Sequence, residues 1–402
     1  MAPFKKGPDY IDASWLTLAA GRPCRNLDLF LFTPAIALRS FATGVEGADL
    51  ALIEGNRGLF DGMDAEGTIS SAELAKLLKA PVLLSVDVTK TTRTAAAMVL
   101  GCQAMDPEVP LAGVILNRVA GSRHESVLRQ SIEGICGVPV LGAVPKLSDD
   151  IFPERHLGLV PPQETEEAGD PLARVAEVVE KYLDVDGILG AAQTAGSLDI
   201  PEQPPEILVT GREDGGPSPR IGVFVDAAFQ FYYPENLEAL SAAGGEIVEI
   251  SPLLDPKLPP VDALYLGGGF PETLAAGLSG NLPFLSSVKE AADEGLPIYA
   301  ECGGAVYLGQ RLHYDGGIFK LAGVLPIEFG FQAKPRGHGY TVLEAIRENP
   351  FYEVGQTLRG HEFHYTFMLP LENEDSGARE FAFRVHRGYG FDGQHDGLIW
   401  GQ

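Results

Sequence analysis

The chain has 402 residues, of which 45% are hydrophobic and 21% charged, and this length and composition suit two globular domains. Its formal net charge of −25 argues against nucleic acid or an anionic membrane as a partner, and an anionic substrate would need a local cluster of Arg and Lys. No apolar run reaches the roughly 18–20 residues of a membrane helix, and without a signal-like start the expected location is the cytoplasm.

Cysteine usage points away from disulfides and zinc. The four cysteines are scattered and form no CxxC pair: Cys24, Cys102, Cys136 and Cys302. We therefore expect neither a disulfide framework nor a structural zinc site.

The first residues, MAPFKKGPDYID, resemble a binding loop that begins with almost no lead-in. Charged residues and a Gly-Pro pair crowd this segment. Asp9 and Asp12 are candidate oxygen ligands for a metal beside Lys5 and Lys6.

Short apolar runs then alternate with helical patterns. Near-continuous Val, Leu and Ile predict buried parallel strands at 50–55, 81–88, 112–119 and 138–145. Helical patterns at 70–80 and 92–105 lie between them. This alternation predicts a doubly wound α/β sheet.

The stretch LIEGNRGLFDGMD places Glu54 at the carboxyl end of a predicted strand, with Asp61 seven residues later. Carboxylates at strand ends are well placed to hold Mg²⁺ and a nucleotide, and Asp9 and Asp12 strengthen that interpretation. The alternative is an acidic surface loop. The sequence contains no GxxxxGK[ST] phosphate loop, since DVTKTT at 87–92 lacks the glycines.

Residues 197–219 are rich in Pro, Gly and charge, which predicts an interdomain linker between a first domain at 1–196 and a second at 220–402. Strand and helix patterns resume after the linker. The expected strands are 220–227, 245–253, 262–270 and 296–304, and the expected helices are 234–244 and 283–295.

The stretch PIYAECGGAVYLGQRL predicts a strand, a tight turn and a helix, with Cys302 at the turn. Small residues at Ala300 and Gly304 would permit the crowded backbone of a nucleophile elbow. The N-terminus of the following helix is expected to favour the thiolate. A buried structural cysteine is the alternative.

The stretch LYLGGGFPE at 264–272 places three glycines after a predicted strand. Their backbone N–H groups could point at a developing oxyanion. Gly268 and Gly269, together with Gly303 directly after Cys302, are therefore candidates for an oxyanion and glutamine pocket. A glycine-rich turn without a ligand is the alternative. GGGFPE followed by ECGG resembles a class I glutamine amidotransferase, which would release ammonia through a cysteinyl thioester.

A cysteine nucleophile needs a base, which is normally a histidine. His361 and His364 lie in RGHEFHYTFM, and their spacing on a strand would place them on opposite faces. Either could line the site, and a structural role is the alternative for both.

Both halves together resemble the cobyrinic acid a,c-diamide synthase family from about Pro3 to Gln402. The resemblance rests on FKKGPDYIDASWLTLAAGRPCRNLD, EGNRGLFDG, GVILNRVAGSRHESVLRQSIE, ERHLGLVP, DAAFQFYYPENLEAL, LGGGFPE, YAECGGAVYLG and GHEFHYT. It implies an α/β fold of two domains, a dethiobiotin-synthetase-like ATP domain without its phosphate loop followed by a class I amidotransferase.

The resemblance also implies a reaction. ATP would activate the a and c acetate carboxylates of a tetrapyrrole as acyl phosphates, and ammonia from glutamine would convert them to amides. By motif position, Cys302 is the glutaminase nucleophile and Glu54 and Asp9 bind Mg²⁺. The ATP and substrate region would contain Asp9, Tyr10, Asp12, Asp61, Asn117 and Arg118.

A polycarboxylate ring needs cations, and the candidates are Lys5, Lys6, Arg22, Arg25 and Arg57. The expected ligands are therefore a tetrapyrrole polycarboxylate, L-glutamine, ATP and Mg²⁺, and the formation of a homodimer is left open.

Two departures from the family pattern lead us to expect a chain truncated at both ends. The phosphate-loop segment before PFKKGPDYID and the YLHLH region after DGLIWGQ are not in the sequence. A degenerate, non-catalytic tetrapyrrole-binding paralogue is the alternative. EGNRGLFDG and DVTKTTRTAAAMVLG also resemble relatives that amidate sirohaem or nickel-sirohydrochlorin, and HEFHYT favours the a,c enzyme over cobyric acid synthase.

Overall fold

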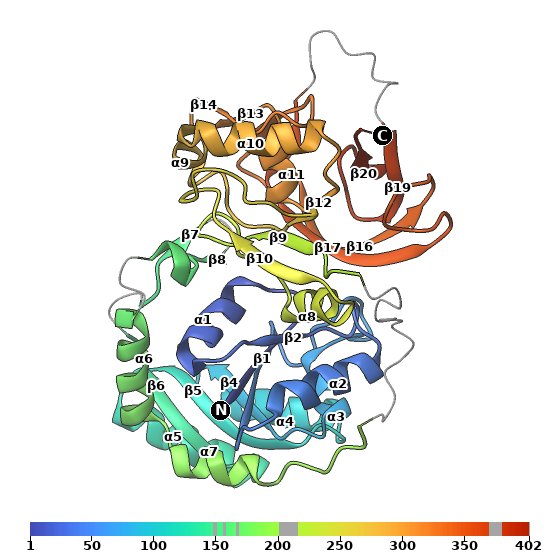
Figure 1. Ribbon diagram of the computed structural model, residues 1–402. Coiled ribbons are helices and arrows are strands. Elements are labelled where there is room, and N and C mark those ends of the chain that lie inside the picture. The colour runs from blue at the N-terminus through green and yellow to red at the C-terminus, as the bar shows by residue number, and fades with distance from the viewer. Residues whose placement is uncertain (148–150, 156–157, 166–168, 201–215, 370–379, 402) are drawn as a thin grey trace. The chain divides into compact units, whose positions relative to one another are not determined.

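The structure is a computed structural model that describes residues 1–147, 151–155, 158–165, 169–200, 216–369 and 380–401. The chain divides into two units, Met1–Glu206 and Ile207–Gln402 (Figure 1). Most of the predicted linker, residues 201–215, lies outside the described residues.

The first unit contains two three-stranded parallel sheets. One has the order β2-β1-β3, with β1 Ala2–Lys6, β2 Arg25–Leu27 and β3 Ala51–Glu54. The other has the order β4-β5-β6, with β4 Val82–Asp87, β5 Leu111–Val119 and β6 Val140–Pro145. The helices that follow these strands are α1 Ile11–Ala20, α2 Pro34–Val45, α3 Ser71–Leu77, α4 Arg93–Met105 and α5 Ser122–Cys136.

A short hairpin and further helices follow the second sheet. They are β7 Glu154–Arg155, β8 Gly158–Leu159, the 3₁₀ turn η1 Pro162–Glu164, α6 Gly169–Tyr182 and α7 Val185–Ala192. None of the helices in the described part of the chain has both the length and the apolar character that a membrane span needs.

The opening residues form a buried strand, so their interpretation as a loop is wrong for Ala2–Lys6. All five residues of β1 are buried, and β1 pairs with strands on both sides. The two lysines misled the sequence interpretation. Lys5 can lie inside the sheet because its charge is met by Asp12 and Glu54. The loop begins only at Gly7, which has a positive φ of 88°.

The strand β3 is less buried than its apolar sequence predicts. Its residues alternate between half-buried and exposed, and Leu52 is 46% exposed. This strand is the last in its sheet order, and among the described residues it pairs only with β1. An edge strand is not covered as a central strand is, and this position explains the difference.

The second unit begins with a four-stranded parallel sheet of order β10-β9-β11-β12. Its strands are β9 Arg220–Phe224, β10 Glu246–Ile250, β11 Ala263–Leu266 and β12 Ile298–Ala300. The helices of this unit are α8 Pro234–Ala242, α9 Ala275–Gly280, α10 Leu282–Asp293 and α11 Gly303–Leu308.

Two further four-stranded sheets complete the second unit. One has the order β14-β13-β15-β18, with β13 Arg311–Tyr314, β14 Gly317–Lys320, β15 Glu328–Phe331 and β18 Thr366–Met368. The other has the order β17-β16-β19-β20, with β16 Gly337–Ala345, β17 Thr357–His364, β19 Glu380–Arg387 and β20 His395–Ile399.

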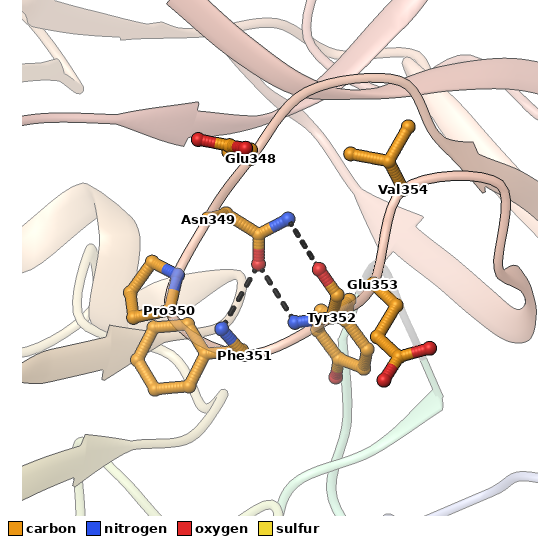
Figure 2. A pocket seen from close by; sticks show the side chains of 7 residues that line it. All are labelled: Glu348, Asn349, Pro350, Phe351, Tyr352, Glu353 and Val354. Atoms are coloured by element: carbon orange, nitrogen blue, oxygen red, sulfur yellow. Dashed lines mark hydrogen bonds between the residues drawn. The ribbon is translucent and has the colours of Figure 1, made fainter.

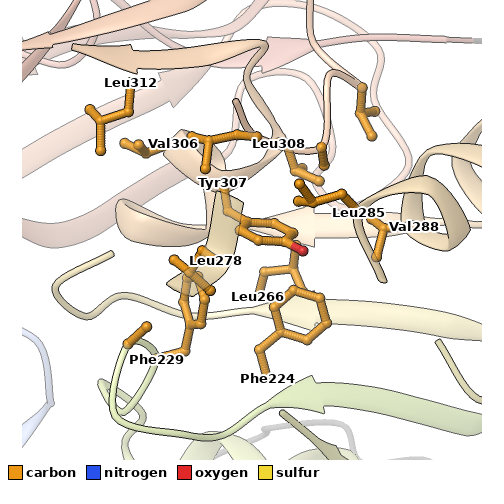
Figure 3. Packing of buried hydrophobic residues seen from close by; sticks show 14 of the residues in the cluster. Phe224, Phe229, Leu266, Leu278, Leu285, Val288, Val306, Tyr307, Leu308 and Leu312 are labelled. Carbon is orange, nitrogen blue, oxygen red and sulfur yellow. The ribbon is translucent and has the colours of Figure 1, made fainter. Parts of the chain in front are cut away.

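An aromatic core holds the parallel sheet of the second unit against its helices (Figure 3). The ring of Tyr307 on α11 lies 5.5 Å from that of Phe224 and 5.6 Å from that of Phe229, edge to face in both pairs. Phe284 of α10 also contacts Phe224. The core therefore anchors the short helix α11 directly behind Cys302.

Truncation of this core should destabilise the second unit. Phe224 is completely buried, so we expect Phe224→Ala to lower the free energy of unfolding by about 3–5 kcal/mol. The matched control Ile318→Ala removes a side chain that is 64% exposed and should change it by less than about 0.5 kcal/mol. Chemical denaturation measures both values, and equal effects would contradict the assignment of this core.

Candidate active site

Cys302 sits on a strained turn between a strand and a helix. The strand β12 ends at Ala300, α11 begins at Gly303, and Cys302 between them has φ 47° and ψ −109°. A non-glycine residue held in this region costs about 1–3 kcal/mol and persists only where its surroundings enforce it. The predicted strand–turn–helix around Cys302 is therefore present, with the cysteine at its apex.

The neighbouring strand β11 enforces this turn. Glu301 N donates to Leu266 O (2.8 Å), and Gly304 N donates to Gly267 O (3.0 Å). A Cβ at Gly304 would lie 2.5 Å from Leu266 O, so only glycine fits there. This contact is the physical reason for the predicted small residue after Cys302.

The glycine-rich turn after β11 lies beside the thiol. A Cβ at Gly268 would lie 3.6 Å from Cys302 Cβ, and one at Gly303 would lie 3.2 Å from Gly269 N. The Gly303 N–H donates to the thiol, and within the described residues the Gly269 N–H makes no hydrogen bond. The structure thus brings the three predicted glycines together with Cys302.

The thiol is surrounded by negative charge. Cys302 is exposed as a residue, yet enough protein surrounds its sulfur that burial is the largest influence on the thiol pKa. Burial raises this pKa above its ordinary value, and the carboxylates of Glu272, Glu301 and Asp396 raise it further. The thiol is therefore protonated at neutral pH and needs a base to become a nucleophile.

The N-terminus of α11 favours the thiolate through one group, because the Gly303 N–H lowers the pKa of Cys302. Burial and the surrounding carboxylates outweigh this hydrogen bond, so the net shift of the thiol pKa is upward. The helix α11 has only six residues. Sequence reasoning treated the helix alone and missed the acidic neighbours, although Glu272 and Glu301 both lie inside the motifs that it used.

Glu301 is held by tyrosines beneath the turn. Tyr265 Oη donates to Glu301 Oε2 (3.2 Å), and Tyr299 also donates to this carboxyl group. Burial raises the pKa of Glu301. Tyr299 Oη in turn lies 3.0 Å from Tyr352 Oη, so a chain of hydroxyl groups leads from the turn toward the 348–354 loop.

That loop forms an open surface pocket of about 580 Å³, lined by residues 348–354 (Figure 2). Asn349 Oδ1 accepts from the N–H groups of Phe351 (3.0 Å) and Tyr352 (2.9 Å), which closes the turn shown in Figure 2. None of the predicted site residues lines this pocket, so it is distinct from the Cys302 site.

The two predicted bases face different surroundings. His361 and His364 both lie on β17, and their odd spacing puts them on opposite faces of its sheet, as predicted. His361 Nε2 lies 2.8 Å from Tyr233 Oη. His364 Nδ1 lies 2.9 Å from Thr366 O, and its Nε2 lies 3.5 Å from Glu362 Oε2.

His364 shares a charged neighbour with Cys302. Burial lowers the pKa of His364, but the contacts with Glu362, Thr366 O and Asp396 raise it above its ordinary value overall. Asp396 on β20 is partly buried, and desolvation of its carboxyl group raises its pKa to about 6. Sequence reasoning missed Glu362 and Asp396, and the only signal for them was their position beside histidines in HEFH and HD.

In the first unit, carboxylates gather around Lys5 at the ends of the first sheet. Lys5 Nζ lies 2.6 Å from Asp12 Oδ2 and 3.2 Å from Glu54 Oε1. Asp9 Oδ1 accepts from Ile11 N (2.7 Å) and Asp12 N (3.1 Å), at the start of α1. Burial raises the pKa values of Asp9 and Glu54, and Asp12 raises both further.

Tyr10 is the N-cap residue of α1 and lies next to this cluster in the chain. Asn26 Nδ2 donates to Gly7 O and Asp9 O (2.8 Å each), which fixes the loop before the helix. The described residues contain no group of three His, Cys, Asp or Glu side chains arranged to hold a metal ion. Mg²⁺ commonly uses one or two carboxylates together with water and phosphate oxygens, so Asp9 and Glu54 are still suitable donors.

The remaining predicted residues of this unit lie elsewhere. Asp61 Oδ2 accepts from Gly58 N (3.0 Å) in the loop after β3. Asn117 and Arg118 lie in β5 of the second sheet, and Arg118 Nη1 is 3.6 Å from Asp87 Oδ2. The structure therefore joins Asp9, Asp12 and Glu54 through Lys5, whereas Asn117 and Arg118 belong to the other sheet.

The acidic surroundings of Cys302 give a test by alkylation. After burial, Glu272 raises the thiol pKa most, so Glu272→Gln should lower that pKa and speed iodoacetamide labelling of Cys302 near pH 8 by about threefold or more. Wild-type labelling should rise steeply with pH above neutrality. Mass spectrometry of the Cys302 peptide measures both rates. Glu290→Gln, an exposed charge change on α10, should have no effect, and an unchanged rate in Glu272→Gln would contradict the assignment.

Comparisons with known proteins match the two halves of the chain to two different domain families. A family model for the CobB/CobQ-like glutamine amidotransferase domain matches residues 220–402, and an AAA domain model matches residues 35–153. The predicted fold class, a parallel-sheet nucleotide domain followed by a glutamine amidotransferase domain, is confirmed.

Several relatives match over almost the whole chain. The cobyrinate a,c-diamide synthase of Magnetococcus marinus is 46% identical over 99% of this chain and 84% of its own length. The enzymes of that name from Archaeoglobus fulgidus and Dehalococcoides mccartyi are 42% and 40% identical, over 99% and 100% of this chain and 84% and 85% of their own lengths. This chain belongs to the cobyrinate a,c-diamide synthase family of glutamine-hydrolysing ligases.

Proposed function

We propose that the protein amidates the a and c acetate carboxylates of cobyrinate, or of a closely related tetrapyrrole, with ATP and glutamine. The observation that carries the proposal is the strained turn at Cys302, with the Gly303 N–H bonded to its thiol and the Gly268–Gly269 turn packed against it, inside the region that matches the glutamine amidotransferase family. Residues 1–196 would carry the ATP-dependent step and residues 220–402 the release of ammonia.

In the glutaminase half, the Cys302 thiolate attacks the carboxamide carbon of glutamine. The oxyanion that forms is stabilised by the N–H groups of Gly269 and Gly303, with Gly268 shaping the pocket. Ammonia leaves, and water then hydrolyses the thioester to glutamate. Of His361 and His364, we propose His364 as the base, because it shares Asp396 as a charged neighbour with Cys302.

In the ATP half, ATP phosphorylates a substrate carboxylate and ammonia displaces phosphate from the resulting acyl phosphate. Asp9 and Glu54 would hold Mg²⁺, which supplies neutralisation of phosphate charge. Burial, and after it the neighbouring Asp12, raises the pKa values of both groups, and a bound cation would offset both effects. Tyr10, Asp12, Asp61, Asn117 and Arg118 would position ATP and the substrate.

Separating the two half-reactions tests the role of Cys302. Cys302→Ala should abolish glutamine-dependent amidation, by at least about 10³-fold, while ammonium salts still support it. Product analysis by mass spectrometry, with cobyrinate, sirohydrochlorin and sirohaem as substrates, measures the activity and identifies the amidated side chains. Cys102→Ala should retain both activities.

Three results would contradict this assignment. Equal loss of glutamine- and ammonia-dependent activity in Cys302→Ala would refute the two-site mechanism. Tetrapyrrole binding without ATP hydrolysis by the wild-type protein would favour a non-catalytic binding protein. Amides on side chains other than a and c would favour a reaction of the cobyric acid synthase type.

Asp61 provides a test of the ATP half. Asp61→Asn keeps an acceptor for the Gly58 N–H but removes the charge, so ammonia-dependent turnover should fall by about 10²-fold. Asp64→Asn, three residues away in the same loop, removes a carboxylate that is bonded to Thr68 N and should stay near wild type. Steady-state kinetics with ammonium as the nitrogen donor measures both variants, and similar turnover in the two would remove Asp61 from the ATP site.

A further inference from the structure

The structure separates the five basic residues that could bind the substrate's acid groups. Lys5 is neutralised by Asp12 and Glu54. Arg22 Nη2 donates to the backbone carbonyls of Gly44 (2.7 Å) and Glu46 (3.1 Å), so its guanidinium holds the end of α2.

Arg25 is buried inside the fold, so we do not count it among the substrate-binding candidates. It is buried in β2, and its Cδ lies 3.0 Å from where a Cβ at Gly44 would stand. Lys6 and Arg57 are the two candidates left after these contacts are assigned.

Lys6 is a buried lysine to which no other described residue is bonded. It is only 7% exposed, and in the described part of the chain its ammonium makes no hydrogen bond or ion pair. Its Nζ is nevertheless not completely sealed from solvent. A largely buried charge of this kind is costly unless a ligand or solvent completes its surroundings.

Arg57 lies beside Lys6 at the same edge of the sheet. It follows β3, which pairs in parallel with β1, and a Cβ at Gly7 would lie 3.2 Å from Asn56 Nδ2. Arg57 is exposed and makes no hydrogen bond or ion pair with another described residue. The carboxyl ends of adjacent parallel strands form the crevice in which α/β sheets bind ligands.

The charges near Lys6 add up to a site for one negative charge. Burial is the main reason why the pKa of Lys6 is lowered, and Arg57 and Lys5 lower it further while Asp28 opposes them. Asp28 is the carboxylate of this group, and its Oδ1 accepts from Phe30 N and Leu31 N. Lys5 is already paired with Asp12 and Glu54, so Lys6 and Arg57 remain against the one carboxylate of Asp28. They leave one positive charge, which suits a single carboxylate better than a phosphate group.

Consecutive residues of a strand point to opposite faces, so Lys5 and Lys6 separate the two charge types. On the Lys5 side, one cation meets Asp9, Asp12 and Glu54. On the Lys6 side, cations predominate. The end of β1 therefore presents an acidic face suited to a metal ion and a basic face suited to an anion.

We propose that Lys6 and Arg57 bind a carboxylate of the polycarboxylate substrate. The Arg57 guanidinium would donate two parallel hydrogen bonds to it, and the Lys6 ammonium would supply a compact positive charge. This inference rests on the proposed function, because it takes the substrate to be a tetrapyrrole polyacid. It assigns the two residues to substrate binding rather than to the chemistry of ATP.

Equilibrium binding to the full chain tests the proposal without requiring turnover. Titration with cobyrinate, followed by quenching of Trp15 and Trp400 fluorescence, gives the Kd. Lys6→Met and Arg57→Gln should each raise the Kd for cobyrinate roughly tenfold or more, whereas the Kd for ATP should change less than about twofold. Lys257→Gln removes one positive charge in the second unit and should leave both constants unchanged.

Stability measurements separate binding from folding. Met matches the buried length of Lys6 without its charge, and the lowered pKa shows that the fold disfavours the charged form, so the Tm of Lys6→Met should equal or exceed that of the wild type. Lys6→Arg should restore part of the affinity.

Each adverse result has a separate meaning. If the wild type binds cobyrinate and both variants bind it equally well, the proposed function stands and this inference fails. A weaker ATP affinity with unchanged cobyrinate affinity would identify a phosphate site and also overturn it. If the wild type binds none of the tetrapyrrole acids, the proposed function and the inference fail together.

Discussion

The left-handed backbone of Cys302 is the constraint on which the second unit depends. Strain at one residue persists only if both flanking segments are fixed, and here each bonds to the β11 end, through Leu266 O and Gly267 O. The aromatic core around Tyr307 holds the helix that follows. Ring packing at 5.5 and 5.6 Å therefore fixes the helix that supports the turn at Cys302.

In the first unit, successive side chains of the single strand β1 point to opposite faces, and this alternation separates Lys5 from Lys6. Lys5 pairs with the carboxylates of Asp12 and Glu54 near Asp9, whereas Lys6 with Arg57 leaves a basic group beside it. A chain with a net charge of −25 can therefore still present a local positive site to an anionic ligand. The position of two neighbouring lysines in a buried strand achieves this separation without a large basic surface.

The sequence predicts regular elements well where the apolar pattern is long, as in β4, β5 and α4. It fails at Ala2–Lys6, because a basic strand is tolerable only once Lys5 pairs with Asp12 of the following helix and with Glu54 of a neighbouring strand, and the sequence pattern does not show these pairs. Motif spacing located the turn at Cys302 and its glycines. It could not give the sign of the thiol pKa, because Asp396 comes from a strand almost a hundred residues later and burial is a property of the whole fold. The division between Lys6 and the other basic residues likewise required three-dimensional contacts.

The raised thiol pKa has a consequence for the resting enzyme. Peroxides and disulfides react with the thiolate form of cysteine, and a solvent-exposed, acidic thiol would be oxidised readily. Cys302 is exposed, but burial and the surrounding carboxylates keep its proton in place. For Cys302 as the proposed nucleophile, the groups that make glutamine hydrolysis depend on a base would therefore also slow oxidation of the thiol between turnovers.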